Sequence, residues 1–146
     1  MLRLAKAFFP AVIAAYLLAS VIFTQMTLAP VQSFGLEVSF TQRLAATWHD
    51  ILGMASSYLL LLLVAFLIAL PVAARLTRLL PTRRAFLFTL AGFIAVVALH
   101  VIMKLALGLS GIAVTRTFFG LLGQGLGGAL GGYVYHRLSL GPTASA

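Results

Sequence analysis

The sequence predicts an all-α integral membrane protein in which four helices cross the bilayer as an antiparallel bundle. Hydrophobic residues make up 62% of the 146-residue chain and charged residues only 8%, which is too little polar surface for a water-soluble fold. Four stretches lack Asp, Glu, Lys and Arg, and each has about the 20 residues that a spanning helix needs. The expected spans are about 8–29, 51–73, 85–107 and 116–135, in a single membrane domain over 1–138 that precedes a disordered tail over 139–146.

The basic residues predict the orientation of these spans. The formal net charge is +8, and among such long apolar tracts the positive-inside rule explains it better than nucleic-acid binding. The inner side would carry seven of the ten basic residues, namely Arg3, Lys6, Arg75, Arg78, Arg83, Arg84 and Arg137. The outer side would carry Arg43, Lys104 and Arg116, together with both acids, Glu37 and Asp50. We therefore expect both termini in the cytoplasm, a location in the cytoplasmic (inner) membrane if the source is bacterial, and anionic lipid headgroups near the arginines at 75, 78, 83 and 84.

The long connection between the first two spans has a helical pattern of its own. Ser39 and Gln42 fit a capping box, and four apolar residues follow at helical spacing, namely Phe40, Leu44, Trp48 and Ile51. This pattern favours a short amphipathic helix on the outer membrane surface, with an irregular loop as the alternative. In the preceding span, Pro10 is tolerated in a first helical turn, which predicts a start near Phe8 or Phe9.

Glycines dominate the fourth span. Six of them define a candidate packing surface of the glycine-zipper kind: Gly120, Gly123, Gly127, Gly128, Gly131 and Gly132. Repeated Gly-x-x-x-Gly spacing leaves one helix face without side chains, so that another helix backbone can approach closely. The partner is either another helix of the same chain or a neighbouring subunit.

Polar residues near the outer ends of the spans form a candidate binding cluster. Four-span topology brings together His100 and Lys104 of the third span, Arg116 of the fourth and Asp50 of the second, with Gln124 and Tyr58 deeper. The hydroxyl of Tyr58 lies too deep for an interfacial aromatic belt, so we expect it to reach Gln124 or His100. The cluster is either a structural ion-pair network or a site for a ligand or ion. No cysteine is present and no carboxylate accompanies His100, so neither a metal nor any other cofactor is expected.

These patterns favour a protein without enzymatic activity. The first hypothesis is an accessory, assembly or stabilising subunit that docks through its glycine-rich helix onto a membrane protein or its own copies. The alternative is binding or translocation of a small anion, a proton or a lipid headgroup through the outer polar cluster. A membrane enzyme acting on lipid, with His100 or His49 as base and Asp50 as its orienting carboxylate, is the weakest hypothesis.

Overall fold

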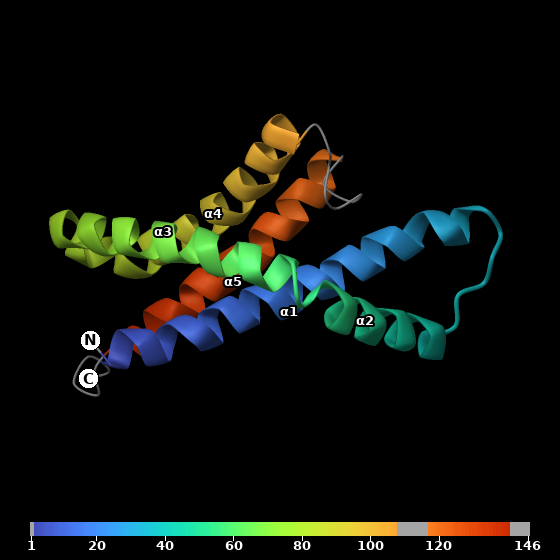
Figure 1. Ribbon diagram of the computed structural model, residues 1–146, viewed down its shortest axis with the longest axis horizontal. Coiled ribbons are helices and arrows are strands. Elements are labelled where there is room, and N and C mark those ends of the chain that lie inside the picture. The colour runs from blue at the N-terminus through green and yellow to red at the C-terminus, as the bar shows by residue number, and fades with distance from the viewer. Residues whose placement is uncertain (1, 108–116, 141–146) are drawn as a thin grey trace.

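The structure, a computed structural model, describes residues 2–107 and 117–140, and the described residues are helices joined by short turns without any strand (Figure 1). The elements in chain order are α1 (Leu2–Ser33), α2 (Phe40–Met54), α3 (Tyr58–Leu79), the 3₁₀ turn η1 (Pro81–Arg83), α4 (Arg84–Leu107) and α5 (Phe118–Ser139).

Three of the described helical stretches are long and apolar enough to cross a membrane. They are Leu4–Ser33, Tyr58–Leu79 and Pro81–Ala106, so the chain has the character of a membrane protein. Helix α5 is as long as α3, at 22 residues each, but its glycines and Gln124 make it less apolar.

Helix α5 lies between α1 and α4 and contacts each of them through a different set of glycines. Gly127 and Gly131 face the small side chains of α1, where a Cβ added to Gly131 would lie 2.7 Å from the Ala11 carbonyl oxygen. Gly128 and Gly132 face α4, where added Cβ atoms would overlap the carbonyl oxygens of Gly92 and Phe88. The described partners of these glycines are therefore helices of the same chain.

The apolar core lies where α3 and α4 meet α1 and α5. Leu62, Phe66 and Leu70 recur every four residues on α3 and are all buried, as are Phe88 and Val96 of α4. This spacing places one face of α3 inward, while its other faces remain exposed within the chain.

Helix α2 folds back along the second half of α1 to form a helical hairpin, here called the α1–α2 arm (residues 25–54), which extends away from α3 and α4 in Figure 1. The turn contains Gly35, whose φ of 80° suits a residue without a Cβ. The Ser39 hydroxyl then accepts from the Gln42 amide (3.3 Å) while the Gln42 side chain accepts from the Ser39 amide (2.9 Å). The capping box predicted from the sequence is confirmed, and it begins a helix rather than an irregular loop.

Several helix boundaries differ from the expected spans. Residues 51–54 end α2 instead of beginning the second span, and α3 starts only at Tyr58. Helix α1 begins at Leu2, several residues before Pro10, and α3 continues through Pro71 to Leu79. Ser139 belongs to α5 rather than to the tail, and residues 141–146 lie outside the described part of the chain.

Candidate functional site

The deepest polar contact in the described structure joins three helices. The Tyr58 hydroxyl of α3 donates to Gln124 Oε1 of α5 (2.8 Å), and Gln124 Nε2 donates to the Ala19 carbonyl of α1 (3.0 Å). Gln124 is fully buried and Tyr58 nearly so. Of the two partners expected for the Tyr58 hydroxyl, Gln124 is the one it contacts. An amide in an apolar core needs such partners, so these two hydrogen bonds hold α5 in register with α1 and α3.

His100 of α4 lies beside this contact. Its ring centroid is 5.7 Å from that of Tyr58, and only 5% of the residue is exposed. Nδ1 lies 2.8 Å from the Val96 carbonyl oxygen. Because a carbonyl only accepts, Nδ1 carries the proton and Nε2 of the neutral ring is an acceptor. No described residue donates to Nε2.

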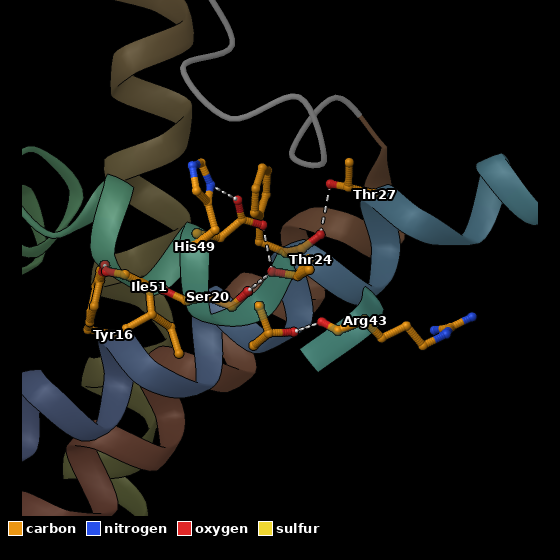
Figure 2. Close-up of polar contacts among 10 residues, drawn as sticks. Tyr16, Ser20, Thr24, Thr27, Arg43, His49 and Ile51 are labelled. Carbon is orange, nitrogen blue, oxygen red and sulfur yellow. Dashed lines mark hydrogen bonds and ion pairs between the residues drawn. The ribbon is translucent and has the colours of Figure 1, made fainter. Parts of the chain in front are cut away.

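Helix α1 contributes three polar side chains that the sequence reasoning missed. Figure 2 shows Tyr16, Ser20 and Thr24 on the side of α1 that faces α2. The Tyr16 hydroxyl donates to the Ile51 carbonyl, and the Ser20 hydroxyl is buried without a described partner. Their spacing of four residues within an apolar span is a signal that could have located them, because it places all three on one helix face.

Asp50 of α2 takes part in the contact between α1 and α2. Its Oδ2 accepts from the Thr24 hydroxyl (2.7 Å), which also lies 3.1 Å from the Ser20 carbonyl. His49 Nδ1 lies 3.8 Å from Asp50 Oδ1, but the His49 side chain is 89% exposed. Farther along the arm, Arg43 donates to Gln25 Oε1 (2.7 Å).

The structure therefore brings together Tyr58, Gln124 and His100, and it places Asp50 on a different contact. Lys104 is exposed on α4, and no ion pair joins it to Asp50 within the described residues. Arg116 lies outside the described residues. We use the name polar core for the set Tyr16, Ser20, Tyr58, His100 and Gln124.

At the opposite end of the bundle, Arg84 is held by the end of α5. Its Nη2 donates to the Ser139 hydroxyl (2.9 Å), and its guanidinium carbon lies 5.4 Å from the centroid of the Phe88 ring. In contrast, Arg75, Arg78 and Arg83 are exposed. The four arginines expected at lipid headgroups thus differ in how freely they can meet a headgroup.

Among the described residues, no group of three or more His, Cys, Asp or Glu side chains could hold a metal ion. Comparisons with protein-family models, with curated proteins and with solved structures found no match to this chain.

Proposed function

We propose that the chain crosses the membrane four times, with α5 as the fourth span and both termini in the cytoplasm. The start of α1, the turn between α3 and α4, and the end of α5 lie at one end of the bundle in Figure 1, as alternating spans would require. The arginines at 75, 78, 83 and 84 gather at that end, whereas Glu37 and Asp50 lie in the α1–α2 arm. The positive-inside rule then places the arm outside the cell.

The absence of cysteine allows a direct test of this topology. Single cysteines at Glu37 and Thr82, both exposed, should react from opposite sides with a membrane-impermeant maleimide. We expect Glu37→Cys to react in intact cells and Thr82→Cys only after permeabilisation. Equal labelling of both in intact cells would overturn the arrangement.

Within this topology the protein acts as a non-enzymatic accessory subunit that docks another membrane protein through the α1–α2 arm. The observation that carries this proposal is an exposed apolar row along α2: Phe40, Leu44, Trp48 and Leu52 are 60–80% exposed. The polar side chains of α2 instead face α1, through Arg43, Thr47 and Asp50. An exposed row of large apolar side chains indicates a surface that binds protein or membrane.

The length of α1 supports a position of the apolar row of α2 outside the hydrocarbon core of the bilayer. At 1.5 Å per residue, the 32 residues of α1 extend about 48 Å, against about 33 Å for the 22 residues of α3 or α5. A bilayer core is roughly 30 Å thick, so an upright α1 would carry the arm past it. The glycines of α5, by contrast, contact α1 and α4, which leaves the arm as the better docking surface.

Native mass spectrometry of the full chain, extracted from its membrane in mild detergent, tests the docking role. We expect a complex with a second membrane protein that Leu44→Gln with Trp48→Gln abolishes. His49→Gln, at an exposed position of the same helix about 100° around the axis from Trp48, is the control and should retain the complex. A strictly monomeric chain, or a complex that persists in the double variant, would overturn docking through the arm.

Protonation at His100 is a second candidate function, favoured by the unpartnered Nε2. His100 lines neither the groove between α3 and α4 nor the groove between α1 and α3, and the proposed occupant is a proton. The Thr24 hydroxyl, which donates to Asp50, lies one helical turn from Ser20 of the polar core, so polar side chains occupy the face of α1 between the arm and the core. Ionisable residues inside a membrane bundle are commonly functional.

Nitrogen NMR of histidine-labelled protein in nanodiscs tests this second candidate. The resonance of His100 is identified by its loss in His100→Gln. Its chemical shift should change reversibly with pH while the protein stays folded. A substitution at His49, whose side chain is exposed, identifies the resonance of that histidine, which serves as the control. A His100 signal that changes only on unfolding would exclude a proton-binding role.

A further inference from the structure

An apolar groove with two arginines at one end lies between α1 and α3. Its volume is about 630 Å³, and its apolar wall includes Phe8 of α1 and Leu67 and Leu70 of α3. Arg75 and Arg78 line it as well, as does Tyr135 of α5. In Figure 1, α1 and α3 diverge toward the end of the molecule where α1 begins, which is the end that contains the groove.

The two arginines have no acidic side chain to pair with. The chain has only two acidic residues, Glu37 and Asp50, and both lie in the α1–α2 arm at the other end of the bundle. Within the described residues, neither Arg75 nor Arg78 forms an ion pair, and both are exposed. Two guanidinium groups three residues apart lie on one helix face and can bind the oxygens of a single phosphate.

We propose that this groove binds one anionic phospholipid, with its phosphate at Arg75 and Arg78 and an acyl chain along the wall formed by α1 and α3. The volume lies within the range of roughly 300–1,000 Å³ that is typical of small-molecule sites. An apolar wall that ends in two unpaired cations matches the two parts of a phospholipid. This site is separate from the α1–α2 arm, so it does not depend on the docking role.

A second groove in the same molecule provides a comparison. It lies between α3 and α4, has a volume of about 520 Å³ and is lined by side chains such as Val64, Ile68 and Ile94. No arginine lines it. Lipid chains of any headgroup can cover this surface, so selectivity for anionic lipid is expected only at the groove between α1 and α3.

The test measures the thermal stability of the full chain in neutral detergent with three probes: dioctanoyl phosphatidylglycerol, dioctanoyl phosphatidylcholine and inorganic phosphate. We expect the phosphatidylglycerol alone to raise the unfolding temperature in a saturable way. Each arginine near an anionic lipid is worth about fivefold in affinity, so Arg75→Gln with Arg78→Gln should weaken binding on the order of 25-fold. Arg137→Gln, at an exposed arginine near the end of α5 that lines neither groove, should leave the affinity unchanged.

A separate variant tests the acyl-chain part of the groove. Ala5 is exposed and lines the groove, so Ala5→Trp should obstruct it without disturbing the core. Ala45→Trp, at an exposed alanine that lines neither groove, is the matched control. We expect the first to lose at least tenfold in affinity and the second to bind normally, which keeps the proposal testable if the double arginine variant fails to fold.

Three results would overturn the site. Equal stabilisation by both lipids would show that the headgroup is not recognised, and equal stabilisation by inorganic phosphate would indicate a soluble-anion site instead. An equal loss in Arg137→Gln and in the double variant would show diffuse attraction to the basic end of the protein.

Discussion

The hydroxyl of Tyr58 donates to Oε1 of Gln124 across 2.8 Å and so joins α3 to α5 in the middle of the bundle. The same amide donates to the Ala19 carbonyl, so one buried side chain connects three helices. Both hydrogen-bonding groups of Gln124 therefore have a partner, as burial in an apolar core requires. This contact fixes the relative positions of the helices that surround His100.

Removing the Tyr58 hydroxyl should destabilise the protein. Tyr58→Phe leaves Gln124 Oε1 without its donor, and hydrogen bonds between membrane helices are typically worth about 1 kcal/mol. The free energy of unfolding, measured by denaturant titration in mixed micelles, should fall by about that amount. Tyr133→Phe, at an exposed tyrosine, should stay within about 0.5 kcal/mol of the wild type. Equal effects at the two tyrosines would contradict a specific role for the contact.

Gly128→Ala should lower the free energy of unfolding more than the addition of one methyl group suggests. The new Cβ would overlap the Gly92 carbonyl oxygen, and backbone cannot move aside as a flexible side chain can. Overpacking of this kind costs about 1–3 kcal/mol, and we expect the upper end of that range in the same unfolding assay. Gly53→Ala meets nothing within 4 Å and should instead stabilise α2 by about 1 kcal/mol, because alanine favours a helix. The prediction fails if both substitutions change stability in the same direction.

Loss of the capping box should weaken α2 without unfolding the bundle. Ser39→Ala removes the hydroxyl that accepts from the Gln42 amide, at a cost of about 1 kcal/mol. Amide hydrogen exchange should become faster in residues 40–54 and stay unchanged in α3 and α4. Thr41→Ala lies in the same first turn but outside the box and serves as the control. Uniform acceleration over all helices would mean that the cap supports the whole fold.

Thr24→Val should loosen the α1–α2 arm. The variant removes the donor to Asp50 Oδ2 and leaves a partly buried carboxylate oxygen without it, at a cost of about 1–3 kcal/mol. Spin labels on single cysteines at exposed Gln32 and Thr41 should then report a broader distance distribution. Thr27→Val is the matched control, since Thr27 donates only within its own helix, to the Phe23 carbonyl. An unchanged distribution in Thr24→Val would show that other contacts hold the arm.

The helices themselves were predictable because local signals determine them. Long apolar runs indicated α1, α3 and α4, and the pair Ser39 and Gln42 located the start of α2, since a capping box acts within four residues. The close approach of α5 to other helices followed from its glycine spacing. A contact of Tyr58 with Gln124 or His100 was predictable as well, because these side chains are polar at similar depth in apolar segments. The structure shows that the hydrogen bond is to Gln124.

The partner of Asp50 could not be predicted in the same way. Charge alone favoured Lys104 or Arg116. Within the described residues, which do not include Arg116, Asp50 accepts from the neutral hydroxyl of Thr24, because α2 folds back along α1. The path of α2 back along α1 depends on the short turn at residues 34–39 and on tertiary contacts. Hydrophobic periodicity predicts neither of them. For the same reason, residues 51–54 looked like the start of a span although they complete α2.

The backbone contact between α4 and α5 also affects how this sequence can change over generations. Glycine has the smallest side chain, so every coding change at Gly92, Gly128 or Gly132 adds atoms where the opposing main chain leaves no space. The exposed leucines and isoleucines of α3 and α4 can be exchanged for other apolar residues with little cost. In a library of random variants, tolerated substitutions should therefore accumulate on the outward surface of α3 and α4 and be nearly absent along the line where α4 meets α5.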